Sequence, residues 1–542
     1  MKCGGRAFLL LFLVNSIFAA AQNASVTGVA TVSSEDLLAQ PVAENWTSYN
    51  GDYTGRRFSR LEQITPANVG QLRAAWVFHP GNSHTLEVTP VVVRGIMYVT
   101  SSNDVFALDA RTGRTLWHYQ RPMSSGLLDD AAAHKNRGVA AWKNFVYSET
   151  DDAHLLCLDA RSGGLIWDIQ YADKEKHYGA TSAPLVINGT VIVGTSGGDS
   201  GVRGFLEAYD AVTGKLKWHL WTIPAPGEFG SDSWPRDAYL YGGATTWMPG
   251  TYDPELNTLY WTTSNAAPDF LGDTRPGDNL YTACVLAIDP DTGKMKWYFQ
   301  FTPHDLYDYD ANETPVLVDL NENGETRKLL AQANRNGFFY LLDRTTGKFL
   351  SATPFVERLN WAKGIDPSGR PVLSGLIPTK EGTRICPGMT GATNWFSPSY
   401  NPDTKTFYVM ALEGCSVLFA SPEPFKRGQT YYNTGAKLPP GEHNQKILLA
   451  LSVRDGKVQW RYPQVGRGDS WGGTLATTAG LVFFADDAGS FEAVDGSTGR
   501  VLWHFNTGQG IHASPMTYSV DGVQYVVIAA GSDVFAFSLP RD

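Results

Sequence analysis

A short motif that recurs along the chain constrains its fold more than any other feature of the sequence. Each copy has an aspartate, two further residues, a serine or threonine and a glycine, followed by three residues and a tryptophan. Complete copies occupy residues 109–117, 159–167, 210–218, 289–297 and 495–503. A unit of this size cannot bury its own apolar face, so successive copies are expected to stack against one another.

Each copy predicts two strands joined by a tight turn. In the first copy, Gly113 supplies the positive φ that the turn needs, and Asp109 can accept hydrogen bonds from the turn amides. Trp117 offers a large flat side chain to the next unit. The repeat is therefore interpreted as a β-hairpin that carries an aromatic docking residue.

Three incomplete copies extend the series. Residues 343–348 lack the tryptophan, residues 452–460 keep Trp460 but lack the aspartate, and residues 73–76 resemble the closing half of a further copy. Seven or eight units of four short strands predict an all-β fold, a β-propeller with tryptophan-docking repeats, and eight blades are favoured.

The composition favours one large domain. The chain has 542 residues and no Pro/Ser-rich linker or charge run that would divide it, so a single propeller over residues 22–542 is preferred to several smaller domains. The formal net charge is −10, with acidic and basic residues scattered along the sequence. This pattern argues against a nucleic-acid partner and provides no polybasic patch for a membrane surface.

The N-terminus has the order of features found in a secretory signal peptide. Lys2 and Arg6 precede an apolar stretch at residues 7–18, and three alanines follow at 19–21. Residues 1–21 are predicted to be removed on export, with a retained N-terminal anchor as the alternative. No other segment reaches this apolar length, so no membrane span is expected.

The cysteines are interpreted as structural. Cys386 and Cys415 lie in irregular glycine-rich sequence and form the expected disulfide pair of an oxidising compartment, whereas Cys157 and Cys284 lie in strand patterns and are expected to be buried. No Cys-x-x-Cys-His sequence occurs, so no covalently attached c-type haem is expected.

Loop residues with oxygen donors indicate a site for a hard cation. The donors are Asp199, within the glycine-rich segment 194–204, Asn265, Asp308 and Asp310. On an extended backbone the last two carboxylates would point to one side, where they repel unless a cation or a proton separates them. The alternative is a solvated acidic loop, although the nearby Tyr307, Tyr309 and Trp247 are not typical of one.

Four further segments carry a family resemblance. They are residues 136–140, 196–204, 302–310 and 471–477, and the similarity extends from residues 46–52 to residues 514–518. In these segments the chain resembles the pyrroloquinoline quinone (PQQ)-dependent alcohol dehydrogenases of the methanol/ethanol type. The resemblance implies PQQ and a metal ion, Ca²⁺ or a lanthanide, as cofactors.

The resemblance also assigns residue roles. Trp247 is similar to the tryptophan on which the flat cofactor lies, and Arg335 to the cation beside its reactive oxygens. The positions that match cofactor-holding residues are Glu87, Arg137, Thr181, Ser196, Gly197, Gly198, Thr245, Asn394 and Trp471.

The implied metal ligands are Asp199, where the family more often has glutamate, together with Asn265 and Asp308. Asp310 follows a pattern that resembles lanthanide-using members, but the choice between Ca²⁺ and a lanthanide stays open because Asp199 is the shorter donor.

The implied activity is oxidation of primary alcohols to aldehydes by hydride transfer to metal-bound PQQ. Asp308 would act as general base and Arg335 would stabilise developing negative charge. The implied partners are a small alcohol and a soluble cytochrome c or similar acceptor in the periplasm, and a homodimer is one conceivable assembly.

Two departures from the family pattern concern the cofactor's surroundings. Residues 131–134, Ala-Ala-Ala-His, stand where such enzymes usually have two adjacent cysteines, and residues 531–533 replace a loop that contains glycine and tryptophan. Two alternatives stay open: a sugar dehydrogenase of the membrane glucose type, which shares residues 303–305 but has lysine at the position of Arg335, and a non-catalytic propeller scaffold.

Overall fold

The computed structural model describes residues 1, 31–81, 84–322, 324–466 and 470–541. The predicted signal peptide, residues 1–21, lies outside the described residues except for Met1. Helical segments are short: α1 (Ser34–Leu38), α2 (Asp129–Ala132), η1 (Val69–Gln71), η2 (Lys174–Lys176), η3 (Gly198–Ser200), η4 (Ser231–Ser233) and η5 (Arg236–Leu240). In the part of the chain that is described, no helix is long and apolar enough to cross a membrane.

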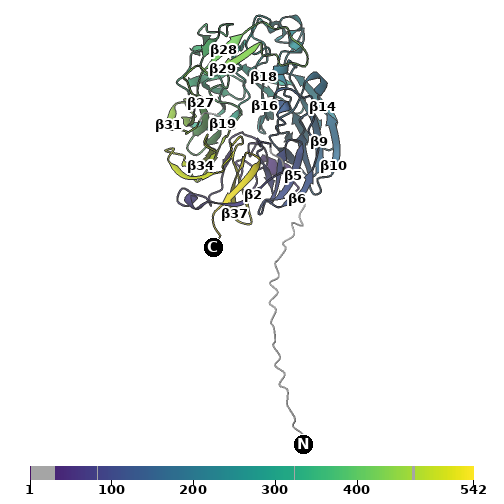
Figure 1. Cartoon of the computed structure of the whole chain (residues 1–542), viewed down its shortest axis with the longest axis vertical. Helices are drawn as coiled ribbons and strands as arrows, with labels where there is room; N and C mark the ends of the chain where they lie inside the picture. The colour runs from purple at the N-terminus through teal and green to yellow at the C-terminus, as the bar shows by residue number, and fades with distance from the viewer. Residues whose placement is uncertain (2–30, 82–83, 323, 467–469, 542) are drawn as a thin grey trace.

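Antiparallel sheets follow one another along the chain and surround a common centre (Figure 1). The first sheet contains β3 (Val91–Val93), β4 (Ile96–Ser101), β5 (Asp104–Asp109) and β6 (Thr115–Tyr119), and the second contains β7 (Val139–Trp142), β8 (Phe145–Glu149), β9 (His154–Asp159) and β10 (Leu165–Gln170). The third contains β11 (Leu185–Ile187), β12 (Thr190–Val193), β13 (Phe205–Asp210) and β14 (Leu216–Trp221). The fourth contains β15 (Thr251–Asp253), β16 (Thr258–Thr262), β17 (Cys284–Ile288) and β18 (Met295–Gln300).

The series continues with the same strand order. The next sheets are β19 (Val316–Glu322), β20 (Glu325–Ala333), β21 (Phe338–Asp343) and β22 (Phe349–Pro354); β26 (Ser399–Asn401), β27 (Thr406–Glu413), β30 (Gln445–Ser452) and β31 (Val458–Pro463); β32 (Thr474–Thr477), β33 (Leu481–Ala485), β34 (Ser490–Asp495) and β35 (Val501–Asn506); and β36 (Met516–Val520), β37 (Val523–Ala530) and β38 (Asp533–Ser538). Smaller sheets pair β23 (Ala362–Ile365) with β24 (Pro371–Leu373), and β25 (Thr383–Ile385) with β28 (Ser416–Ala420) and β29 (Thr434–Lys437).

The two ends of the described chain join in one sheet. Strand β2 (Arg73–Phe78) pairs antiparallel with β38, so an N-terminal strand completes the sheet formed by the last three strands. In Figure 1 this sheet, labelled at β2 and β37, lies close to the C-terminus. The short β1 (Phe58–Ser59) also adds, in parallel, to β32. The pairing of β2 with β38 joins the two ends of the described chain, and β2 contains the incomplete copy at residues 73–76, which takes the place of the second strand of a copy, as its pattern predicts.

The tryptophans of the repeat dock as the sequence predicted. The indole N–H of Trp76 donates to the carbonyl oxygen of Ala110 at 3.2 Å, and that of Trp117 to Ala160 at 3.0 Å. Each ring also lies on the turn glycine of the following copy: a Cβ added to Gly113 would lie 2.6 Å from Trp76. Glycine is therefore needed at this position for two reasons: the turn has a positive φ, and the neighbouring indole leaves no room for a Cβ atom.

This double constraint predicts a large cost for alanine at a docking glycine. Gly293 has φ +72°, and its added Cβ would lie 2.6 Å from Trp218, whereas Gly522 has φ +75° with nothing within 4 Å. Gly522→Ala should cost about 1 kcal/mol for backbone strain alone, and Gly293→Ala roughly 2–4 kcal/mol because the indole must also move. Denaturant unfolding midpoints of the two variants test this, and equal costs would contradict the docking role.

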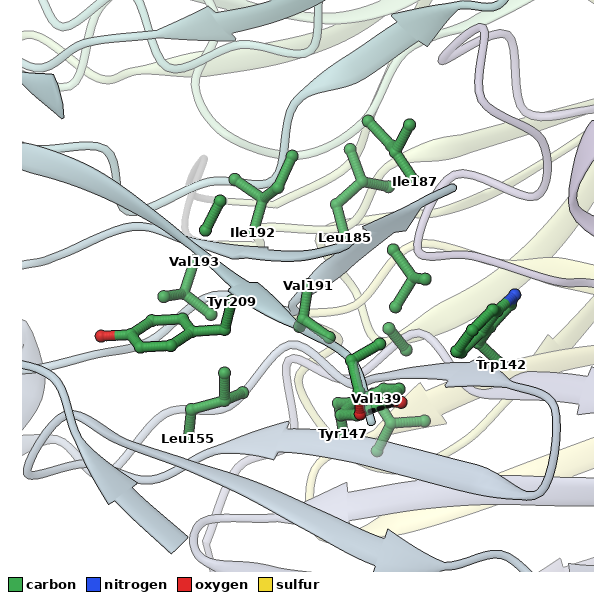
Figure 2. Packing of buried hydrophobic residues seen from close by; sticks show 14 of the residues in the cluster. Val139, Trp142, Tyr147, Leu155, Leu185, Ile187, Val191, Ile192, Val193 and Tyr209 are labelled. Carbon is green, nitrogen blue, oxygen red and sulfur yellow. Dashed lines mark hydrogen bonds between the residues drawn. The ribbon is translucent and has the colours of Figure 1, made fainter. Parts of the chain in front are cut away.

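Apolar side chains fill the space between neighbouring sheets. Figure 2 shows Val139 and Leu155, from β7 and β9, packed near Val191 and Ile192 of β12, and all four are buried. The inner strands are buried on both faces, which explains why their sequences are almost continuously apolar. The sheets thus form a rigid support for the loops that emerge at their ends.

Candidate cofactor and metal site

One pocket collects every residue that the sequence analysis assigned to the site. Its cavity is about 280 Å³, close to the lower end of the range for small-molecule sites, roughly 300 Å³. The lining residues are Glu87, Ala133, Lys135, Arg137, Thr181, Ser196, Gly197, Gly198, Asp199, Thr245, Trp247, Ser264, Asn265, Asp308, Asp310, Arg335, Asn394, Trp395, Trp471 and His512. The structure places these residues together; their roles stay predictions.

The strand order of the sheets explains this convergence. The lining segments either precede the first strand of a sheet, as Arg137 precedes β7, or follow its second strand, as Arg335 follows β20. In an up-and-down antiparallel sheet these two positions lie at the same end. Residues far apart in the sequence therefore meet at one end of the ring.

One side of the pocket combines a cation with aromatic rings. The Arg137 guanidinium carbon lies 5.1 Å from the ring centre of Trp247 and 4.4 Å from that of Trp395. Trp395 in turn stacks on Trp471 with the ring planes 7° apart. Arg137 also pairs with Glu87 at 2.7 Å and donates to the Thr181 carbonyl oxygen at 2.8 Å. This network fixes a positive charge among flat side chains.

Several polar atoms on this side have no hydrogen-bond partner within the described chain. They are Arg137 Nε, Thr181 Oγ1 and Ser196 Oγ, and all three are buried. Buried donors of this kind ordinarily have partners. Their position in the pocket fits a ligand that brings carboxylates or carbonyls, as PQQ does.

The glycines of this segment are required by close packing. A Cβ on Gly197 would lie 2.3 Å from the His177 carbonyl oxygen, and one on Gly198 would lie 3.0 Å from Thr245 Oγ1. The hydroxyl of Thr245 is 2.9 Å from that of Ser264, and its amide donates to the same Ser264 hydroxyl at 2.8 Å. The segment thus packs tightly between its neighbours at the wall of the pocket.

The other side of the pocket is acidic around one arginine. Arg335 Nη1 donates to Asp310 Oδ2 at 2.6 Å, and Nη2 donates to Asp308 Oδ2 at 3.3 Å. Asp310 Oδ1 also accepts the amide of Asn265 at 2.7 Å. Burial disfavours the charged arginine, but the charges of Asp308 and Asp310 outweigh it and raise the Arg335 pKa.

The backbone of this loop differs from the expected extended conformation. Asp308 has φ +63°, a region that residues other than glycine seldom adopt. The two carboxylates still meet, because Arg335 reaches both of them from the loop after β20. Arg335 thus contacts the carboxylates of Asp308 and Asp310 at the same time.

The predicted disulfide is present. Cys386 bonds to Cys415, and Arg335 Nη2 donates to the carbonyl oxygen of Met389 at 3.1 Å, shortly after the bridge. Cys157 and Cys284 are buried free thiols, as expected. The disulfide therefore fastens a segment that helps to orient Arg335.

The pocket contains oxygen donors of the kind that hard cations bind. Over the described ranges, no group of three or more His, Cys, Asp or Glu side chains is arranged to hold an ion by itself. Asp199, Asn265 and Asp308 nevertheless line one pocket and offer the oxygen ligands that Ca²⁺ and lanthanide ions accept. The protein's oxygen ligands for an ion in this pocket would be Asp199, Asn265 and Asp308.

Sequence reasoning missed several lining residues. No motif in the sequence identifies three of them. Trp395 follows the predicted Asn394, Lys135 is two residues before the predicted Arg137, and His512 lies in the segment before β36. Asn394, which was predicted, donates to the Thr390 carbonyl oxygen at 2.9 Å and accepts the Trp395 amide at 2.9 Å. Its side chain orients the loop that carries Trp395.

The two segments that depart from the family pattern have clear positions. Residues 131–134 include the end of α2, Ala133 lines the pocket, and His134 pairs with Asp151 at 2.7 Å. Asp533 instead pairs with His79 at 2.6 Å. Small side chains thus stand at the pocket near α2, where the family usually has the cysteine pair.

A buried acid near Arg137 predicts a pH-dependent stability. Burial raises the pKa of Glu149 to about 8, and its carboxylate accepts the hydroxyl of Tyr171 at 3.1 Å. An acid with a raised folded-state pKa stabilises the fold at low pH, and this contribution is lost as the pH rises from about 4.5 to about 8. In Glu149→Gln the free energy of unfolding should fall by about a few kcal/mol less over this pH range than in wild type. Thermal midpoints at pH 5 and pH 8 check this, and parallel curves for both proteins would contradict it.

Known proteins share this architecture. Residues 46–359 and 453–526 match the family described as "PQQ: Glucose/ethanol/alcohol dehydrogenase, beta-propeller domain". The quinoprotein alcohol dehydrogenase PedH of Pseudomonas putida is 36% identical over 551 residues, covering 96% of this chain and 92% of its own length. The 1-butanol dehydrogenase (cytochrome c) of Thauera butanivorans is 36% identical and covers 90% of this chain and 74% of its own.

A solved structure of a related enzyme has the same fold. A europium-containing methanol dehydrogenase superposes with a TM-score of 0.84 at 30% identity, over 93% of this chain and 99% of its own. The matched residues include the repeats and the pocket loops up to Arg335. The chain belongs to the PQQ-dependent glucose/ethanol/alcohol dehydrogenase family of β-propellers.

Proposed function

We propose that the chain is a periplasmic PQQ-dependent alcohol dehydrogenase that oxidises primary alcohols to aldehydes. The observation that carries the proposal is the pocket itself, in which Asp308 and Arg335 lie together with the oxygen donors Asp199 and Asn265. Family membership supports the cofactor, and the europium-containing neighbour supports Ca²⁺ or a lanthanide as the ion.

Both sides of the pocket have a part in holding PQQ. Arg137, Thr181 and Ser196 have buried polar atoms without partners among the described residues, and these would bind its carboxylates. Trp247 would support the flat ring system. When bound, PQQ supplies an electrophilic carbonyl that accepts a hydride, which no side chain can do.

The acidic side supplies the protein's share of the chemistry. Asp308 would take the proton of the alcohol hydroxyl at its carboxylate, since it is the least buried acid of the pair with 16% of its side chain exposed, against 8% for Asp310. Arg335, held by Asp310 and the Met389 carbonyl, would keep its positive charge where negative charge develops. The substrate hydroxyl must therefore enter between these two groups.

The finer points of organisation belong to the same proposal. The sheets around the ring would form eight blades, residues 1–21 would be an export signal, and residues 22–542 would be the mature propeller. Electrons would pass to a separate cytochrome c or similar acceptor. Two observations support a separate carrier: the sequence contains no Cys-x-x-Cys-His motif, and the Thauera relative is a 1-butanol dehydrogenase (cytochrome c).

Substrate panels test the activity. The full chain, supplied with PQQ and either Ca²⁺ or La³⁺, should reduce an artificial dye with ethanol and 1-butanol and much more slowly with glucose. Faster reduction with aldoses would favour a sugar dehydrogenase. No reduction with any substrate, despite bound PQQ, would favour a scaffold without catalysis.

A further inference from the structure

One acidic side chain next to the pocket has no part in the function proposed above. Asp269 follows Asn265 in the loop between β16 and β17, and it is completely buried. Neither of its carboxylate oxygens has a hydrogen-bond partner among the described residues. Burying a carboxyl group without partners is costly, because nothing replaces the hydrogen bonds to water that it loses.

Backbone contacts bring the loop of Asp269 to that of Asp199. The Tyr431 amide donates to the Asp199 carbonyl oxygen at 2.6 Å, and the Phe270 amide donates to the Tyr432 carbonyl oxygen at 3.2 Å. The two neighbouring residues 431 and 432 therefore tie both acidic loops together. This link does not depend on any side-chain charge.

The charges around Asp269 are mostly of its own sign. Besides burial, the groups that act on it are Asp199, Asp308, Arg275 and Asp310, and their combined effect raises its pKa far above the ordinary value. The guanidinium of Arg275 is already directed to other oxygens, at 2.9 Å from Asn279 Oδ1 and 2.9 Å from the Pro268 carbonyl oxygen. The protein alone thus gives Asp269 little compensation.

We propose that Asp269 is an additional carboxylate ligand of the ion that Asp199, Asn265 and Asp308 would hold. The inference rests on the proposed function, because it needs that ion in the pocket. Coordination requires Asp269 to turn about its own side-chain bonds towards Asp199.

The length and charge of the proposed metal-binding side chains support Asp269 as an additional ligand. Asp199 is one methylene shorter than the glutamate that resembling enzymes more often have, so it leaves room for a further donor. Hard cations accept six to eight oxygen ligands, more than the three assigned side chains provide. If Asp269 joined Asp199, Asp308 and Asp310, four carboxylates would surround the ion, and a trivalent ion would offset them better than a divalent one.

Ion binding to the full chain tests the inference. Wild type, Asp269→Asn and the matched control Glu492→Gln are freed of ions and titrated with Eu³⁺ and with Ca²⁺ in the presence of excess PQQ. Glu492 is likewise buried with a raised pKa, but it does not line the pocket. Since even outer partners of metal ligands are worth roughly 10–100-fold in affinity, Asp269→Asn should weaken Eu³⁺ binding at least about tenfold.

Two further readouts are independent of activity. The loss in log affinity should be about one and a half times as large for Eu³⁺ as for Ca²⁺, because the Coulomb energy scales with charge. Eu³⁺ luminescence lifetimes in H₂O and D₂O should report more coordinated water in Asp269→Asn, and at least as much in Asp269→Ala. The ion-free variants should unfold at the wild-type temperature or above it.

The outcomes separate this inference from the proposed function. Wild-type affinity and an unchanged water count in both Asp269 variants would overturn the ligand role alone. A lower unfolding temperature of the ion-free Asp269→Asn protein, with normal Eu³⁺ binding, would assign Asp269 to structure instead. A wild-type chain that binds neither PQQ nor Eu³⁺ would refute the proposed function itself.

Discussion

Replacing Asp308 with asparagine is expected to abolish turnover while PQQ stays bound. The substitution keeps the shape of the side chain and removes the carboxylate that would act as base, and general base catalysis is typically worth about 10²–10⁴ in rate. The remaining carboxylate of Asp310 cannot substitute for it, because both its oxygens are engaged, by Arg335 and by the Asn265 amide. The measurement is kcat with an excess of alcohol and dye, alongside the PQQ content of the protein.

Glu492→Gln provides the control, since it neutralises a buried acid outside the pocket. It should retain the wild-type rate. An Asp308→Asn enzyme that keeps its PQQ and works within a few-fold of wild type would exclude Asp308 as the base. Loss of PQQ from the variant would instead show that its main task is to hold the ion.

Replacing Arg137 with glutamine is expected to weaken PQQ binding roughly 100-fold. Hydrogen bonds between charged groups contribute about 1.5–3 kcal/mol each, and a guanidinium can form two with one carboxylate. Arg137 is held between Trp247 and Trp395 and is paired with Glu87, so its position is fixed before the ligand arrives. Quenching of tryptophan fluorescence by PQQ gives the affinity.

Thr181→Val is the graded comparison, because it removes one buried hydroxyl without changing the shape of the side chain. The affinity of Thr181→Val for PQQ should be about tenfold lower than that of wild type, as expected for the loss of a single hydrogen bond. Equal affinities for wild type and Arg137→Gln would mean that PQQ lies elsewhere in the molecule. A larger loss in Thr181→Val than in Arg137→Gln would reverse the roles given to these residues.

The repeats made most of the fold predictable from the sequence. A glycine turn followed by a tryptophan, as in residues 109–117, reports a local hairpin and its contact with the next hairpin, and both are present. The incomplete copy at residues 73–76 also revealed the closing strand β2, because it keeps the docking Trp76. The blade count depends on a complete account of the sheets, which local motifs do not provide.

Part of the site was predictable from the sequence, because some residue types indicate their chemical role directly. Oxygen donors and a glycine-rich segment pointed to one pocket, and the structure brings them together. The bridge from Arg335 to Asp308 and Asp310 was not predictable, because it joins loops whose approach depends on two whole sheets. The same holds for Trp395 and for Asp269, whose importance follows from burial and from neighbours distant in the sequence.

Equilibrium dialysis of PQQ against the ion-free full chain is the most direct measurement of whether a planar redox cofactor and an ion share this pocket. One PQQ per chain should bind when Ca²⁺ or La³⁺ is present, and binding should fall sharply without an ion or in an Asp199→Ala, Trp247→Ala double variant. PQQ binding that is absent with both ions, or that is unchanged in the double variant, would contradict the proposed site.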